Sequence, residues 1–328
     1  GTGMVKFSGD LSFINAAMEG LRFAPLQNAF GVDAGALDIQ VEDQGFTGAG
    51  GAESVQHNVQ IEIRPVNDSP VLSGIETAPL AFVENGDSMQ VSAALEVSDA
   101  DGDIAGASVK IIDHAPGDWL GFDVGPVVIE GSYDPTRGIL QFTGDATPLE
   151  YQALLRSVTY VSKSENPRPG TRSIVFRATD GTGGTLALSN EVSRAVQVTA
   201  VNDAPAISAL DSVWAIEDTR LVFSTSNNNR ITVQDLDRDV LEVTASVYSG
   251  HLDFDRVPGV EVLEEIDEGG GYYQVKFQGL VKNVNEALNG LAYTPAKDVS
   301  GYSRDALQVM VADKGNTGTG GVQEASHS

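Results

Sequence analysis

The sequence predicts an all-β protein of tandem sandwiches, each with one short helix. Residues 37–42 (LDIQVE), 173–180 (SIVFRATD) and 306–313 (ALQVMVAD) alternate apolar and polar side chains with a period of two, which is typical of half-buried antiparallel strands. The 36 glycines and 13 prolines among 328 residues supply frequent turns between such segments. An internal repeat of about the length of a seven-stranded, immunoglobulin-like sandwich is the third observation.

The repeat is visible in two short segments, RPVNDSPVL at 64–72 and TAVNDAPAI at 199–207. They place Val66 and Val201 135 residues apart. At twice that offset, VKFSGDLSFINAAMEGLRFAP (5–25) recurs as VKFQGLVKNVNEALNGLAYTP (275–295). We therefore expect residues 1–65 to be the C-terminal half of a repeat, 66–200 a complete repeat, and 201–328 a repeat that lacks its last strand.

One helix in each repeat is predicted by apolar residues at positions i, i+3, i+4 and i+7. They are Ile14, Ala17, Met18 and Leu21; Tyr151, Leu154, Leu155 and Val158; and Val284, Ala287, Leu288 and Leu291. In the middle repeat, Thr147 and Glu150 have the spacing of a capping box, with Pro148 at the first helical position. This favours a capping role for Glu150.

The balance of 20 Lys and Arg against 46 Asp and Glu leaves a net charge of −26. Such a charge argues against binding to nucleic acid or to an anionic membrane, and favours divalent cations or simple solubility. The absence of cysteine excludes disulfides, thiolate metal sites and cysteine nucleophiles. No apolar run approaches the roughly 20 residues of a membrane span, so no membrane insertion is expected in this segment.

Three carboxylates at alternate positions, Asp99, Asp101 and Asp103, lie in the segment VSDADGDIAG (97–106). The pattern recurs as Asp235, Asp237 and Asp239. Like charges this close repel one another unless water or a cation screens them. Calcium accepts six to eight oxygen ligands in flexible geometry, whereas zinc prefers His or Cys, which do not cluster here. The alternative is an Asp-rich turn that faces water, but the recurrence of the spacing favours a cation.

These segments together resemble a known family. The strand and linker VQVTAVNDAPAI (196–207), the turn SDADGD (98–103) and the turn ATDGTGG (178–184) are similar to the cadherin-like tandem repeats of large calcium-binding bacterial surface adhesins. The resemblance covers all three repeats. It implies cadherin-like, immunoglobulin-like Greek-key sandwiches with Ca²⁺ bound at each junction, by ligands from the linker and from both neighbouring repeats.

The resemblance also implies a set of metal ligands. At the first junction they are Asn67, Asp68, Asp99, Asp101, Asp103 and Asp180; at the second they are Glu84, Asn202, Asp203, Asp235, Asp237, Asp239 and Asp313. Glu217 corresponds to Glu84 and would serve a further junction. The chain has Pro65 and Ala200 where the family linker opens with aspartate, and it lacks the acidic mid-repeat tetrapeptide unless Glu150 replaces it. One or two ions per junction are therefore expected, not three.

The predicted function is that of a calcium-rigidified extracellular or cell-surface adhesin segment, acting in cell adhesion, extension or self-association. Its expected partners are the neighbouring repeats, a second chain of the same kind or a surface glycan. The alternative is a carbohydrate-binding surface module with Trp119, Tyr272 and Tyr273 as stacking platforms. No enzymatic activity is expected, because the four histidines do not recur between repeats and no nucleophile triad or phosphate loop is visible.

The half-repeat at the N-terminal end leads to one more expectation. A half-sandwich exposes an apolar face and an unpaired strand edge, and such edges recruit other chains. We expect the strand at residues 59–63 to complete the third sandwich of a neighbouring molecule. The alternative is that residues 1–65 are loosely ordered and the protein is monomeric.

Overall fold

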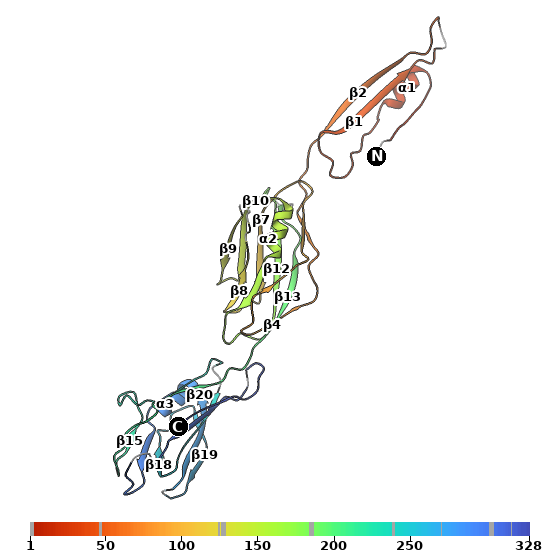
Figure 1. Cartoon of the computed structure of the whole chain (residues 1–328). Helices are drawn as coiled ribbons and strands as arrows, with labels where there is room; N and C mark the ends of the chain where they lie inside the picture. The colour runs from red at the N-terminus through yellow and green to blue at the C-terminus, as the bar shows by residue number, and fades with distance from the viewer. Residues whose placement is uncertain are drawn as a thin grey trace.

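The computed structural model describes residues 3–45, 48–123, 125, 129–183, 187–237, 240–269, 271–301, 305–315 and 317–328. A hairpin with a helix and two β-sandwiches follow one another along an extended chain (Figure 1). The predicted all-β class is confirmed: the protein consists mostly of β-strands arranged in several sheets, with one short helix in each repeat.

The first repeat contains helix α1 (Leu11–Met18) and the antiparallel hairpin of β1 (Gly31–Glu42) and β2 (Ser54–Ile63). None of the residues of α1 is buried, and Leu11 and Phe13 are 73% and 71% exposed. The helix predicted from the apolar spacing is therefore present, but its apolar face lacks the opposing sheet that the other repeats have. The pairing of residues 59–63 with a second molecule stays a prediction.

The middle repeat is a sandwich of a large and a small sheet. In hydrogen-bonding order the large sheet contains β4 (Leu80–Val83), β13 (Val192–Thr199), β12 (Gly170–Thr179), β7 (Ile104–Ile112), β10 (Ile139–Ala146) and β9 (Glu130–Asp134). The small sheet contains β5 (Met89–Gln90), β11 (Thr159–Ser162) and β8 (Asp118–Gly121), and a separate pair is formed by β3 (Val71–Ser73) and β6 (Glu96–Ser98). Only the β13–β4 pair is parallel among the described strands of this repeat.

Alternation along the strands builds the core of this sandwich. Every second residue of β12, including Ile174 and Phe176, is buried against the opposite sheet, as expected for a strand with one face in the core. Helix α2 (Pro148–Arg156) closes one end and buries Tyr151, Leu154 and Leu155. Its capping box is confirmed by hydrogen bonds in both directions between Thr147 and Glu150, and those from the Thr147 side chain and backbone lower the pKa of Glu150.

The third repeat follows the same plan. Its elements are β14 (Ala206–Ser208), β15 (Leu221–Val222), β16 (Thr232–Gln234), β17 (Val240–Val247), β18 (Gly250–Asp253), β19 (Val260–Asp267), β20 (Tyr273–Leu280), α3 (Val281–Leu288), β21 (Ala292–Pro295), β22 (Gln308–Ala312) and β23 (Glu324–His327). β23 pairs antiparallel with β22. β23 corresponds to Ser54–His57, the first four residues of β2 in the first repeat, 270 residues earlier, and the expectation that the repeat lacks the remainder of this strand stays a prediction.

A buried ion pair lies in the core of the middle sandwich. Arg172 Nε donates to Asp118 Oδ2 at 2.7 Å, and the two side chains are 1% and 0% exposed. The hydroxyl of Tyr160 donates to the other carboxylate oxygen at 2.7 Å. In the third repeat the corresponding tyrosine, Tyr293, instead contacts Asp305, which stands at the position of Arg172. The tyrosine at this position therefore contacts an acid at the start of β8 in the middle repeat, and an acid in the segment before β22 in the third repeat.

Glu76 gives the middle sandwich an acid-sensitive contact. Its carboxylate accepts hydrogen bonds from Ser92 Oγ at 2.6 Å and Ala93 N at 2.9 Å, and Arg194 lies 3.6 Å away. The hydrogen bond from Ser92 is the largest cause that lowers the pKa of Glu76, to about 2. Since the unfolded chain titrates near pH 4.3, this contribution to stability is complete above that pH and is lost as pH falls toward 2.

Glu76→Gln is expected to reduce the free energy of unfolding of the middle sandwich by about 1 kcal/mol at pH 7. The difference from wild type should shrink between pH 4.5 and pH 2, because the wild-type carboxylate becomes protonated there. Urea unfolding of a Trp214→Phe background, followed by Trp119 fluorescence, measures the effect. A constant difference across this pH range would contradict the assignment.

Candidate metal site at the junctions between repeats

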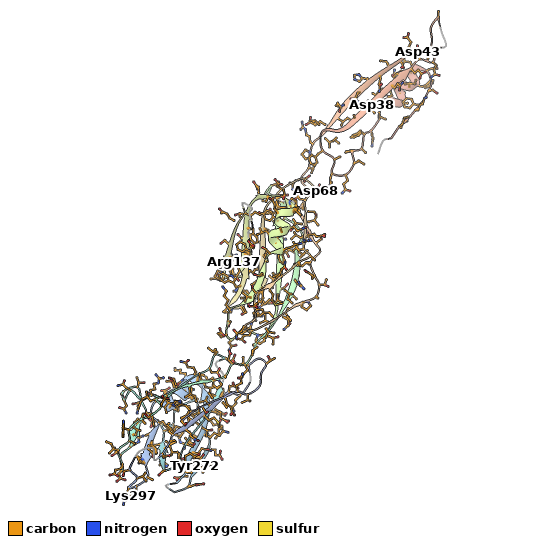
Figure 2. All side chains as sticks on the ribbon, in the orientation of Figure 1. Asp38, Asp43, Asp68, Arg137, Tyr272 and Lys297 are labelled. Carbon is orange, nitrogen blue, oxygen red and sulfur yellow. The ribbon has the colours of Figure 1, made fainter. Side chains whose placement is uncertain are left out.

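Amide and carboxylate groups meet where the first linker enters the middle sandwich. Asn67 Nδ2 donates to Asp180 Oδ2 at 2.8 Å, and the backbone N–H of Asp68 donates to the carboxylate of Asp101. Asp101 N in turn donates to Asp99 Oδ1 at 2.9 Å, while Asp99 Oδ2 is buried and accepts no hydrogen bond from a described residue. Figure 2 shows Asp68 at the end of the middle sandwich that faces the hairpin. Linker and turn residues thus form one cluster here.

The second junction repeats these two contacts. Asn202 Nδ2 donates to Asp313 Oδ2 at 2.8 Å, and Asp203 N donates to Asp237 Oδ2 at 2.7 Å. Asn202 is 2% exposed, Asp237 5% and Asp313 2%, so this cluster is well buried. The asparagine of each linker therefore holds the strand-end aspartate, and the aspartate that follows it contacts the alternating acidic turn.

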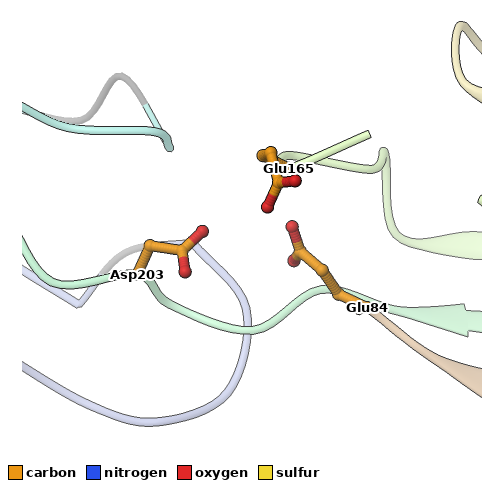
Figure 3. A group of neighbouring side chains, drawn as sticks. All are labelled: Glu84, Glu165 and Asp203. Atoms are coloured by element: carbon orange, nitrogen blue, oxygen red, sulfur yellow. The ribbon is translucent and has the colours of Figure 1, made fainter. Parts of the chain in front are cut away.

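The middle sandwich adds two carboxylates to the second junction. Glu84 follows β4, and Glu165 lies in the loop between β11 and β12. Carboxylate oxygens of Glu84, Glu165 and Asp203 lie within 4.8 Å of one another. Figure 3 shows the three side chains converging from separate segments. Two repeats therefore contribute acidic groups to one small volume.

The electrostatics of this cluster favour a cation. Burial raises the pKa of Glu84, and the charges of Asp203, Asp237 and Glu165 raise it further, against a lowering hydrogen bond from Val201 N. That hydrogen bond, 2.7 Å long, occupies Oε2 of Glu84. A buried carboxylate among like charges is stable in its ionised form only when a positive charge lies close to it.

The available atoms fit calcium. Glu84 Oε1, Asn202 Oδ1 and Asp203 Oδ2 are buried and accept no hydrogen bond from a described residue. All are oxygen atoms from carboxylates or an amide, which are the ligands that calcium accepts. The described cluster contains no histidine and the chain contains no cysteine, so its donors do not suit zinc.

The remaining predicted ligands fall into three groups. Asp235 is half-buried beside the second junction. Asp313 Oδ1 accepts hydrogen bonds from the backbone N–H groups of Gly315 and Gln323, which fix the carboxylate, and Asp313 Oδ2 in turn orients the linker residue Asn202. Asp103 and Glu217 are exposed, and neither belongs to a metal-compatible group among the described residues. Asp239 lies outside the described residues.

The aspartates that end these strands all accept hydrogen bonds from neighbouring residues. For Asp180, burial raises the pKa, but hydrogen bonds from Thr182 and Asn67 outweigh it and lower the pKa. Asp43, the counterpart in the first repeat, accepts hydrogen bonds from Gly45 N and Glu53 N, as Asp313 does from Gly315 N and Gln323 N. These hydrogen bonds fix the orientation of each aspartate at the end of a strand.

Sequence reasoning missed two residues at the second junction. Glu165 lies in the three-carboxylate group, and Asn166 Nδ2 donates to the backbone oxygen of Asp237 at 2.6 Å, which connects the middle and third repeats directly. The segment SKSENPRPG (162–170) offers only a single acidic residue as a signal. Glu165, not the capping residue Glu150, supplies the mid-repeat carboxylate at this junction.

The aromatic residues proposed as carbohydrate platforms are arranged differently from that prediction. Lys163 Nζ lies 3.7 Å from the centre of the Trp119 ring, and Tyr133 packs beside it at 4.7 Å. Tyr273 is 2% exposed and donates to Glu265, while Tyr272 is half-buried next to Tyr248. The prediction of open stacking platforms is therefore wrong for Trp119 and Tyr273.

No protein-family model and no curated protein sequence matches this chain. Its structure is similar to extracellular cadherin domains. Mouse cadherin-23 EC22-24 is 14% identical, with 89% of this chain and 72% of that chain covered and a TM-score of 0.32. Mouse protocadherin-24 EC1-3 is 14% identical, with 93% of this chain and 86% of that chain covered and a TM-score of 0.29. Drosophila N-cadherin EC1-4 is 12% identical, with 91% of this chain and 59% of that chain covered and a TM-score of 0.24. Among the described residues, no helix has the length and apolar character to span a membrane.

Proposed function

We propose that this chain is a calcium-stiffened segment of an extracellular adhesion-type protein, similar to the tandem repeats of large bacterial surface adhesins. The observation that carries the proposal is the meeting of Glu84 and Glu165 from the middle repeat with Asp203 from the linker within 4.8 Å. Three carboxylates from separate segments gain nothing from this proximity unless a cation joins them. Carbohydrate binding through the three aromatic residues has weaker support, since they do not form open platforms.

The linker of the second junction is already attached to the third repeat by hydrogen bonds. Thr319 N donates to Ala200 O at 2.9 Å, Asn202 N donates to Thr319 O at 2.8 Å, and Gln323 Nε2 donates to Asn202 O. Toward the middle repeat, the described residues form hydrogen bonds through Glu84 and Asn166. The carboxylates of Glu84, Glu165 and Asp203 therefore lie where the linker meets the middle repeat, and a cation bound there would hold the two repeats together.

Calcium would supply the positive charge and the shared coordination shell that hold the two repeats together. Glu84 and Glu165 would hold it from the middle repeat, and Asn202, Asp203 and Asp237 from the linker and the third repeat. Without the ion, mutual repulsion drives these side chains apart and the linker bends. With it, successive sandwiches act as a rod that extends and presents other parts of the protein, or associates with a second chain, at the cell surface.

Calcium is expected to raise the melting temperature of the protein, whereas magnesium should have little effect. Extracellular calcium modules bind at about 10⁻⁴ to 10⁻³ M, so linkage adds on the order of 1 kcal/mol per site at millimolar calcium. Magnesium retains its water and requires a tight octahedral shell. Calorimetry with each ion at the same ionic strength measures the shifts.

Small-angle scattering of the same samples should show a longer and narrower distribution of particle dimensions with calcium. Equal thermal shifts with both ions would indicate general screening of the −26 charge and would contradict the proposal.

A further inference from the structure

A polar hollow lies on the third repeat, away from the residues of the junction. It has a volume of about 400 Å³ and lies between helix α3 and the loop that joins β15 to β16. Six residues line it, and all have polar or charged side chains: Thr225, Arg230, Lys282, Asn285, Glu286 and Asn289. The volume is within the range of small-molecule sites, and the lining suits a polar ligand.

The middle repeat has a side chain where the third repeat has this hollow. There Arg156, at the end of α2, donates through Nε to Leu95 O at 2.7 Å and so spans the gap between the helix and the segment that precedes β6. Its counterpart 133 residues later is Asn289, whose shorter side chain turns to the loop and accepts hydrogen bonds from Thr225 N and Oγ1. The hollow therefore results from the replacement of a long side chain by a short one.

A hydrogen bond that recurs in both repeats shows that residues 133 apart in helices α2 and α3 occupy equivalent positions. Gln152 Oε1 accepts a hydrogen bond from Val97 N in the middle repeat, and Asn285 Oδ1 accepts one from Val233 N in the third. These pairs show that both helices sit on the equivalent strand in the same way. The difference at Arg156 and Asn289 is consequently local to the hollow.

Two cations of the hollow are available to a ligand. Arg230 and Lys282 are exposed, and neither forms an ion pair with a carboxylate among the described residues. In a chain with 46 acidic and 20 basic residues, two unpaired cations in one hollow are a local reversal of charge. An arginine and a lysine that line one hollow favour a carboxylate or another anion as ligand.

The carboxylate of Glu286 restricts which anionic ligands suit the hollow. This carboxylate lines the same hollow, so one positive charge is left in excess, and one negative charge on a ligand is enough to balance it. Glu286 can instead accept hydrogen bonds from hydroxyl groups. A ligand with one carboxylate and several hydroxyl groups satisfies both requirements.

We infer that this hollow binds a uronic acid residue of an acidic polysaccharide. The sugar carboxylate pairs with Arg230 and Lys282, and sugar hydroxyls donate to Glu286. This site is separate from the calcium junctions, and its binding does not depend on the proposed function.

Titration calorimetry with a hyaluronate tetrasaccharide, at fixed calcium concentration, tests the inference. The acidic sugar is expected to bind, and its methyl ester, which lacks the charge, is not. Arg230→Gln combined with Lys282→Gln should weaken binding by about tenfold or more, because both charge-assisted contacts are lost. The matched control, Arg256→Gln with Lys297→Gln, removes the same charge outside the hollow and should bind as wild type does.

Asn289→Arg provides a second, independent variant. It recreates the arrangement of Arg156, fills the hollow and should abolish sugar binding; because Thr225 N and Oγ1 lose their acceptor, the melting temperature of the variant is measured alongside to establish that it folds. Its calcium-induced rise in melting temperature should equal that of wild type, which separates this site from the junctions. Undiminished binding by Asn289→Arg, equal binding of the methyl ester or of inorganic sulfate, or no binding at about 10 mM sugar would overturn the inference.

Discussion

Replacing Arg172 by methionine is expected to reduce the free energy of unfolding of the middle sandwich by about 3–5 kcal/mol. Asp118 is fully buried, and its carboxylate accepts hydrogen bonds from Arg172, Tyr160 and Ala115. Removal of the guanidinium leaves a negative charge in the core without a counter-ion, and the neighbouring Tyr160 hydroxyl cannot replace that charge. Urea unfolding followed by Trp119 fluorescence in a Trp214→Phe background measures the loss.

A second variant separates the charge from the packing. When Asp118→Asn is added to Arg172→Met, the buried charge disappears while an oxygen remains to accept from Tyr160. Part of the lost stability should therefore return. If the double variant is as unstable as Arg172→Met alone, the loss is due to packing of the arginine side chain and not to the unpaired carboxylate.

Glu84→Gln together with Asp203→Asn is expected to change stability in opposite directions with and without calcium. Without calcium the variant should melt at a higher temperature than wild type, because two of three mutually repelling carboxylates are neutralised. With millimolar calcium it should lose on the order of 1 kcal/mol relative to wild type, since the site at the second junction is lost. Calorimetry in chelator and in calcium measures both differences.

The matched control is Glu217→Gln. This residue is the sequence counterpart of Glu84 in the third repeat, but it is exposed and lies in no carboxylate group among the described residues. It should leave the calcium response unchanged. A Glu84→Gln, Asp203→Asn variant that keeps the wild-type response to calcium would remove the second junction from the proposed mechanism.

The candidate site was predictable to the extent that it lies within one linker and the turns beside it. Asn67 and Asp68, and Asn202 and Asp203, are marked by the repeated segment VND, and their contacts with the strand-end and turn aspartates recur at both junctions. Asp103 carries the same alternating spacing as Asp99 and Asp101 but is exposed, so its role as a ligand stays a prediction. Alternation places a side chain on a face of the chain, and burial depends on what covers that face.

The sequence by itself determined the elements and their order: period-two strands, a helix at i, i+3, i+4 and i+7 in each repeat, the capping box at Thr147, and the 135-residue spacing of the repeats. These features are local, because backbone geometry and hydrogen bonding between near neighbours produce them. Only the tertiary structure decided that Glu165 joins Glu84 and Asp203, that Tyr160 and Tyr293 contact acids at different places in their repeats, and that Asn289 leaves a hollow where Arg156 fills one. Each of these contacts joins residues far apart in the chain, and so depends on the paths of loops and on the reach of single side chains, which no periodicity records.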